Sequence, residues 1–402
     1  MLIDKNRFIK SVFFLMVVLM TTSTYFQIGS LPIFMFLWIV LFSYILMRKK
    51  TNNNDTSDII QTNKRRTIFT ILALWLMYAM IQYLLLGYNW AGTRYFILIF
   101  INVTTFIMII SYAKDINIIK LLNKGILFGL TINLTVAFWE INTSSHIKAL
   151  TLDYERRFES TPLTFFSNPN DFASFLFCSV VILMFELVMS NNKKYRFLLY
   201  ILLGATIYII FETNSRGGIN GILIFFSLYI ILRIIGKISK GEKNMFGILS
   251  LLIFILSIGM LILLIVDNYF FSIFSTYNEY IDDRLYLWEQ SFELFINSFL
   301  LGIGPGQALI KMGGNVHFLF LEILTEYGVF VVAGLAVVFF KLVKMIYPFI
   351  NSKINALITS FIIVFLPVSI SSSSMTKIYA IWVIFGIIYA LKINDCDKNL
   401  NT

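Results

Sequence analysis

Residues 267–328 read DNYFFSIFSTYNEYIDDRLYLWEQSFELFINSFLLGIGPGQALIKMGGNVHFLFLEILTEYG. This segment is the longest interruption between the hydrophobic runs of a 402-residue chain. It contains an arginine behind two aspartates, a stretch with one apolar face, a glycine-rich turn and a histidine. A second short polar segment, NSRGG, lies at residues 214–218. We interpret the rest of the chain as the scaffold that brings these two segments together.

The composition indicates a membrane protein. Mean hydropathy is +0.81 and only 13% of the residues are charged, whereas a soluble protein carries about 25%. Hydrophobic runs long enough to cross a bilayer recur along the whole chain. We therefore predict an all-α, polytopic integral membrane protein with about twelve transmembrane helices. We place them at residues 10–27, 30–47, 67–87, 95–112, 123–140, 171–189, 197–213, 217–235, 245–266, 328–347, 354–371 and 376–392.

The distribution of basic residues predicts the orientation. The strongest basic clusters flank the loop at residues 48–66, so we assign this loop to the cytoplasm. Alternating the predicted spans from there places 24 of the 32 lysines and arginines on the cytoplasmic side. Both termini are then cytoplasmic. Because topology explains the net charge of +10, we expect no nucleic-acid partner.

The spans and polar segments divide the chain into three regions. We predict an N-terminal transmembrane bundle at 1–196, a central region at 197–347 with a large outer loop at 267–327, and a C-terminal hairpin and cytoplasmic tail at 348–402. Cys178 and Cys396 lie on different elements, so we predict no disulfide. No acidic cluster suggests a bound metal, and no cofactor is expected.

Five outward arginines are not explained by the charge rule: Arg94, Arg156, Arg157, Arg216 and Arg284. Arg216 lies where two glycines open a predicted helix, and a helix N-terminus beside a guanidinium favours an anion. A tight turn with Arg216 paired to Glu212 is the alternative. Arg156 and Arg157 either belong to a solvated charge cluster or bind an anionic sugar.

Arg284 opens a segment with apolar residues on one helical face, which predicts a helix in the outer membrane interface. Its guanidinium is either a second anion contact or a partner for Asp282 and Asp283. The following GIGPG, at residues 302–306, predicts a chain reversal and is weak evidence for phosphate binding. A third feature, the interfacial His317, suits general-base chemistry or contact with lipid headgroups. On a helix, Glu322 and Glu326 would point away from it.

Taken in order, these segments resemble the O-antigen ligase and repeat-unit polymerase family of bacterial surface and capsular polysaccharide assembly. The resemblance covers about residues 200–345. Its pieces are NSRGG at 214–218, DR at 283–284 with Trp288, LLGIGPG at 300–306, His317, and EYG at 326–328. The family usually has asparagine after the histidine, where this chain has Phe318.

The resemblance implies a metal-independent, inverting glycosyltransferase on the outer face of the bacterial plasma membrane. Its donor would be a glycan on undecaprenyl diphosphate. His317 would act as the catalytic base. The residues that would bind the substrate are Arg216, Arg284, Ser215 and Gly217, with Arg156 and Arg157 as further candidates.

Three functions remain open from the sequence. The first is a repeat-unit polymerase, which transfers the growing chain to an acceptor unit that is also lipid-linked. The others are a ligase that attaches finished polymer to a lipid or wall acceptor, and a flippase for lipid-linked oligosaccharides. The expected partners are the lipid-linked donor and acceptor, the bilayer, and chain-length regulator and flippase proteins.

Overall fold

The computed structural model describes residues 5–22, 25–28, 31–49, 59–86, 88–112, 116–147, 161–166, 168–240, 284–347, 352–370 and 378–400. Several sequence-based expectations lie outside these ranges: the predicted span at 245–266, the pair Arg156 and Arg157, and the aspartates that precede Arg284.

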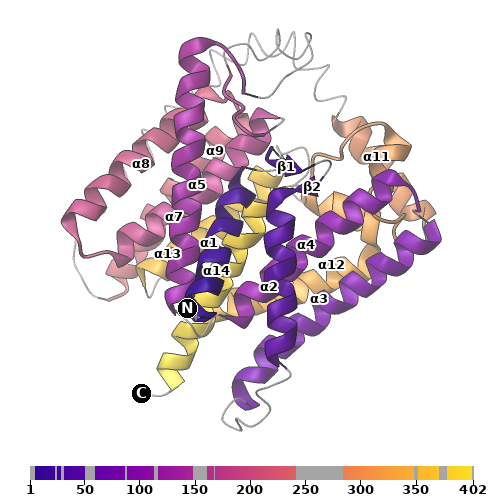
Figure 1. Cartoon of the computed structure of the whole chain (residues 1–402), viewed down its shortest axis with the longest axis horizontal. Coiled ribbons are helices and arrows are strands. Elements are labelled where there is room, and N and C mark those ends of the chain that lie inside the picture. Colours follow the sequence, from indigo (N-terminus) through magenta and orange to yellow (C-terminus); the bar gives the residue numbers. More distant parts are fainter. Residues whose placement is uncertain are drawn as a thin grey trace.

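The described chain is helical apart from one short hairpin, which confirms the predicted all-α class (Figure 1). In the hairpin, β1 pairs with β2 in antiparallel fashion. A further helix occupies residues 284–297; we call it the 284–297 helix. The labelled elements are α1 (Lys5–Thr21), β1 (Gln27–Ile28), β2 (Leu31–Pro32), α2 (Ile33–Lys49), α3 (Ile59–Leu86), α4 (Trp90–Ser111), α5 (Ile116–Thr143), α7 (Pro169–Met189), α8 (Lys193–Glu212), α9 (Arg216–Ile238), α11 (Gln307–Met312), α12 (Leu319–Ile346), α13 (Lys353–Ser369) and α14 (Tyr379–Leu400).

Seven of the described helices are long and apolar enough to cross a membrane: α3, α4, α5, α7, α8, α9 and α12. Four shorter apolar helices lie within α1, α2, α13 and α14. These helices are those of a multi-pass membrane protein, and each corresponds to one of the predicted spans. The prediction for α12 was wrong in one respect, because this helix begins at Leu319, nine residues before the predicted start at 328.

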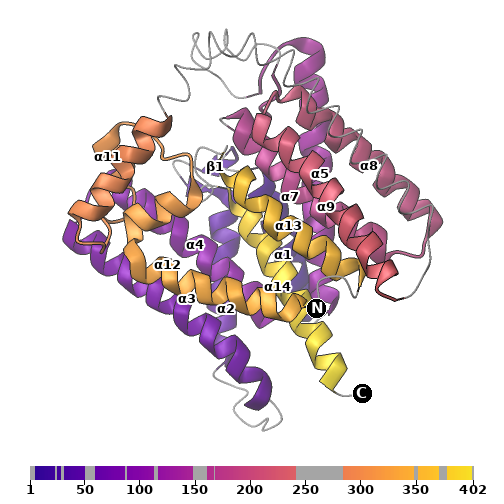
Figure 2. The same cartoon turned by 180° about the vertical axis from the view of Figure 1, so that it is seen from behind.

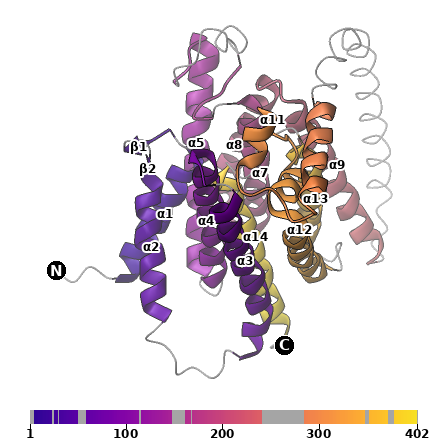
Figure 3. The same ribbon diagram turned by 90° about the vertical axis from the view of Figure 1, so that its right-hand side faces the viewer.

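The core of the bundle surrounds α7. In its apolar window 78% of the residues are buried, against 17% for α12, and α7 contacts α5, α8, α9, α13 and α14. Figures 1 and 2 show α8 and α9 on one flank and α3, α11 and α12 on the other. In Figure 3, α1 and α2 lie to one side, α9 to the other, and α7 and α14 between them.

Small residues bring the helices into close contact. A Cβ built at Gly129 of α5 would overlap Thr21 of α1, and one at Gly221 of α9 would overlap Val368 of α13. Close backbone approach of this kind is a common means of helix association in membranes, where burial from water contributes little. Inside the bundle, the Glu186 side chain of α7 accepts a hydrogen bond of 2.7 Å from Asn123 of α5.

Candidate functional site

The 284–297 helix packs against the first turns of α12 through a buried polar pair. The hydroxyl oxygens of Ser291 and Thr325 lie 2.6 Å apart, and the Thr325 hydroxyl also donates to the Ser291 carbonyl at 3.1 Å. Both residues are fully buried. Because buried hydroxyls need hydrogen-bond partners, this pair sets the position of the 284–297 helix on α12.

The glycine-rich turn at residues 302–306 is bound to a break in α12. Gly328 has φ 78° and ψ −178°, so the helix bends there. Two carbonyls next to the bend accept hydrogen bonds from the turn: the Thr325 oxygen from the Ile303 N–H and the Glu326 oxygen from the Gly304 N–H, each at 2.9 Å. These two amides are therefore engaged within the protein. The expected chain reversal is present, and its Ile303 and Gly304 amides do not form a phosphate cradle.

Helices α3 and α4 hold this turn from the other side. The Leu301 carbonyl accepts hydrogen bonds from the Tyr78 hydroxyl at 2.6 Å and the Gln82 side chain at 2.8 Å. A Cβ at Gly306 would lie 2.9 Å from the Tyr95 ring of α4. The N-terminal half of the chain thus contributes directly to the position of the turn. The hydropathy pattern carried no signal for these contacts, because they join residues more than 200 positions apart.

His317 lies in the loop between α11 and α12, and its backbone adopts the left-handed conformation with φ 56°. This conformation is uncommon for a residue other than glycine, and such residues often cluster at functional sites. The indole N–H of Trp288 donates to the Val316 carbonyl at 2.9 Å, and the rings of Trp288 and Phe318 lie 5.7 Å apart. Arg284 is one helical turn before Trp288, so the helix that begins with Arg284 adjoins the loop that contains His317.

Glu322 and Glu326 do not face solvent. Both are buried in the first turns of α12, where their carboxylates interact electrostatically with the phenol of Tyr95, as do Arg94 and Asp171. Arg94, one of the arginines that the charge rule left unexplained, has an exposed side chain and lies within electrostatic range of Tyr95, beside a buried acidic cluster of Glu322, Glu326 and Asp171 on α12 and α7. The sequence signal for it was a pair of glutamates four residues apart at the start of an apolar helix. Within the described ranges, no group of three or more His, Cys, Asp and Glu residues is arranged to hold a metal ion.

Arg216 is the first residue of α9 and its side chain is exposed. Ser215 is the N-cap of this helix and is buried, and its hydroxyl accepts a hydrogen bond of 3.4 Å from the Gly218 N–H. A Cβ at Gly218 would lie 2.8 Å from Ala173 of α7, two positions after Asp171. The start of α9, which presents Arg216, thus packs on α7, whereas the helix that begins with Arg284 packs on the loop of His317.

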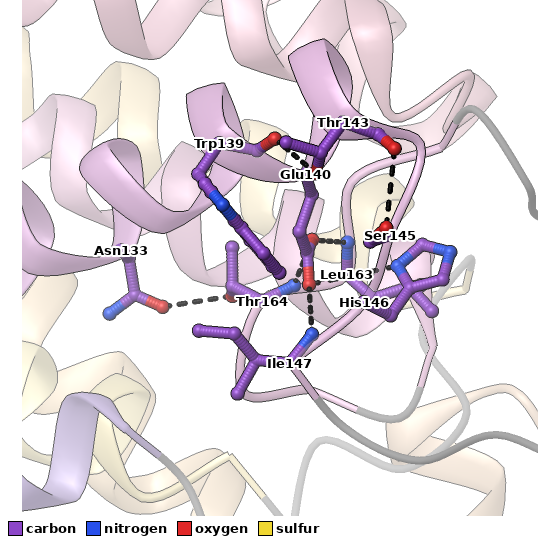
Figure 4. A network of polar contacts seen from close by, with 9 residues as sticks. All are labelled: Asn133, Trp139, Glu140, Thr143, Ser145, His146, Ile147, Leu163 and Thr164. Carbon is purple, nitrogen blue, oxygen red and sulfur yellow. Dashed lines mark hydrogen bonds and ion pairs between the residues drawn. The ribbon is translucent and has the colours of Figure 1, made fainter.

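The segment between α5 and α7 is anchored at both ends by Glu140 (Figure 4). One carboxylate oxygen accepts hydrogen bonds of 2.8 Å from the N–H groups of Leu163 and Thr164. The other accepts one of 3.3 Å from the Ile147 N–H and lies 3.6 Å from the His146 ring. A single buried carboxylate therefore holds the two flanks of the segment that contains Arg156 and Arg157.

Comparison with known proteins agrees with the predicted resemblance. Residues 199–339 match a family model described as O-antigen ligase. A curated relative, the teichuronic acid biosynthesis protein TuaE of Bacillus subtilis (strain 168), is 24% identical over 356 residues, which represent 80% of this chain and 71% of the relative. The matched region contains NSRGG, the 284–297 helix, the glycine turn and His317. The chain is similar to surface-polysaccharide assembly proteins of the O-antigen ligase and polymerase kind.

Proposed function

We propose, starting from a chain whose central region matches the O-antigen ligase family, that this protein is a polysaccharide repeat-unit polymerase. It transfers a glycan chain from undecaprenyl diphosphate to the sugar of an acceptor repeat unit, itself lipid-linked. The reaction takes place at the outer face of the plasma membrane, with both termini of the protein in the cytoplasm. We propose that the transfer needs no metal and inverts the configuration at the anomeric carbon.

In this proposal the groups have separate tasks. The His317 imidazole takes the proton from the acceptor hydroxyl. The acceptor oxygen then bonds to the anomeric carbon, and the bond from that carbon to the diphosphate oxygen breaks. The leaving oxygen keeps the electron pair, and Arg216 and Arg284 stabilise its charge. The first turn of α9, which Ser215 caps and which contains Gly217, adds the positive end of a helix dipole beside Arg216.

One observation carries this assignment: the Trp288–Val316 hydrogen bond of 2.9 Å, which fixes the helix of Arg284 on the loop of His317. A cation for the leaving group and a base for the acceptor are thereby presented by two adjoining elements. A transporter breaks no glycosidic bond and so requires neither a cation for a leaving group nor a general base. Transporters keep polar groups near the middle of the membrane, whereas these residues flank the apolar spans.

A ligase of finished polymer is the second candidate, because the matching family model is described as a ligase. The two functions differ in what accumulates when the gene is deleted. Loss of a polymerase leaves single lipid-linked repeat units, and loss of a ligase leaves long lipid-linked polymer. Analysis of lipid-linked saccharides from a deletion strain decides between them.

The direct test uses the purified protein with lipid-linked repeat units as the only substrate. We expect long chains on the lipid carrier. If the units stay single, and a separate reaction given finished lipid-linked polymer and another acceptor shows transfer of that polymer, the polymerase assignment is wrong and the ligase assignment replaces it. If lipid-linked units only cross the membrane of a vesicle, the protein is a flippase.

A further inference from the structure

An apolar groove of about 170 Å³ lies between α12, α13 and α14, with residues of α3 and α4 at its base. Leu72, Phe106 and Ile323 form part of the base and are buried. Phe320, Phe339 and Leu366 line it as well and are exposed. The lining is almost entirely hydrocarbon, so the groove suits an apolar ligand and cannot satisfy a polar one.

The bend at Gly328 shapes this groove. Leu319 and Ile323 precede the bend and Leu335 and Val338 follow it, yet all four line the same space. A straight helix would direct its two halves along one axis. The carbonyls of Thr325 and Glu326, next to the bend, also accept hydrogen bonds from the glycine turn. The groove and the candidate site therefore adjoin the same bend in α12.

One end of the groove adjoins the candidate site. Leu319 and Phe320 follow His317 by two and three positions and line the groove, and Glu322 lies on the same helical turn. The groove continues along α14 from Ile381 to Tyr389. A lipid whose polar head reacts at His317 would place the first carbons of its tail beside Leu319.

We propose that this groove binds the head-proximal part of the polyprenyl tail of a lipid-linked substrate. The proposal rests on the proposed function and adds a tail subsite to it. An apolar cavity of about 150 Å³ accommodates benzene, so a groove of about 170 Å³ holds a branched five-carbon isoprene unit and part of the next. The remaining tail lies in the bilayer.

Two adjacent valines of α12 allow a matched test. Val338 lines the groove, whereas Val337 is 45% exposed and is not among its lining residues. In the full-length protein, Val338→Trp is expected to raise KM for the undecaprenyl-linked repeat unit about tenfold, which equals about 1.4 kcal/mol. A geranyl-linked analogue keeps the two head-proximal isoprene units that the groove is proposed to hold, so its KM should rise to a similar extent. Val337→Trp should resemble the wild type with both substrates.

Photo-crosslinking keeps the test decisive if Val338→Trp does not fold. With benzoylphenylalanine in place of Val338, we expect capture of the undecaprenyl-linked unit, competed by undecaprenyl diphosphate. With the same group in place of Val337, we expect little capture. Capture of bilayer phospholipid alone at position 338 overturns the proposal, as does an unchanged KM in a folded Val338→Trp protein.

The two hypotheses fail separately. If the wild-type protein makes polymer but position 338 captures no polyprenyl lipid, the tail subsite is wrong and the polymerase stands. If position 338 captures the polyprenyl lipid but the protein transfers no sugar, the tail subsite stands and the enzymatic assignment falls.

Discussion

The indole nitrogen of Trp288 lies 2.9 Å from the carbonyl oxygen of Val316. Trp288 follows Arg284 by one helical turn, and Val316 directly precedes His317. This hydrogen bond therefore links the two elements that present a cation and a base. We therefore expect the relative position of Arg284 and His317 to depend on Trp288, although Trp288 itself carries no charge.

Replacing Trp288 with phenylalanine keeps an aromatic ring beside Phe318 but removes the N–H donor. Leaving an acceptor without its donor costs about 1–3 kcal/mol. We expect polymer synthesis to fall by about tenfold while the amount of folded protein changes little, as measured by transfer rate and size-exclusion profile. Trp139→Phe, at an exposed position of α5, is the control. Equal rates for the two variants would contradict the role of the hydrogen bond.

Arg284→Lys tests whether a forked cation is required. Lysine keeps the charge but cannot make two parallel hydrogen bonds to a diphosphate. We expect a loss of transfer of at least about tenfold with Lys, and no long chains with Arg284→Ala, Arg216→Ala or His317→Ala. Gel analysis of chain length in cells provides the measurement. Normal chain length in the three alanine variants would exclude the proposed mechanism.

Gly328→Ala should disrupt the bend in α12. Gly328 has φ 78° and ψ −178°, a backbone region essentially restricted to glycine that costs another residue about 1–3 kcal/mol, and the Cβ of alanine would overlap the Leu301 carbonyl group. Gly313→Ala is the control for a positive φ alone, because Gly313 has φ 70° and ψ 3° with open space around its Cβ. We expect a small loss of thermal stability for Gly313→Ala and a much larger loss for Gly328→Ala. Similar losses would show that overlap with Leu301 is unimportant.

Glu140→Gln removes the charge that accepts amide hydrogen bonds from both flanks of the segment between α5 and α7. Hydrogen bonds to charged groups contribute about 1.5–3 kcal/mol, so we expect a clear fall in melting temperature and faster proteolysis between α5 and α7. Glu293→Gln, at an exposed position of the 284–297 helix, should behave as the wild type. Unchanged proteolysis in Glu140→Gln would show that the flanks are held by other contacts.

Hydropathy predicted the spans well, because a transmembrane helix is specified by local composition and length. It failed at the start of α12, where the expected boundary at 328 was the bend rather than the beginning of the helix. At the bend, the carbonyls that precede Gly328 accept hydrogen bonds from the turn at 302–306 instead of from the next turn of the helix. These contacts are not local in sequence. The distribution of basic residues singled out Arg94, but it could not show that the buried acidic residues near Arg94 come from α7 and α12.

The roles assigned to Arg284 and His317 stay predictions. The structure shows that the helix beginning with Arg284 contacts the loop of His317 through Trp288. The sequence could not predict that Ser215 is a buried N-cap or that the glycine turn uses its Ile303 and Gly304 amides on α12. In both cases the polar group has two possible partners, a ligand or the protein itself, and only the three-dimensional contacts distinguish them.

The hydrogen bonds from Tyr78 and Gln82 to the Leu301 carbonyl have a consequence for chimeric enzymes. Grafting residues 199–339 alone onto a relative would separate the glycine turn from the α3 side chains that grip it. A recombinant exchange that keeps specificity must therefore transplant α3 and α4 together with that segment. The part of the protein that has to be exchanged as one unit therefore consists of two separate stretches of the chain.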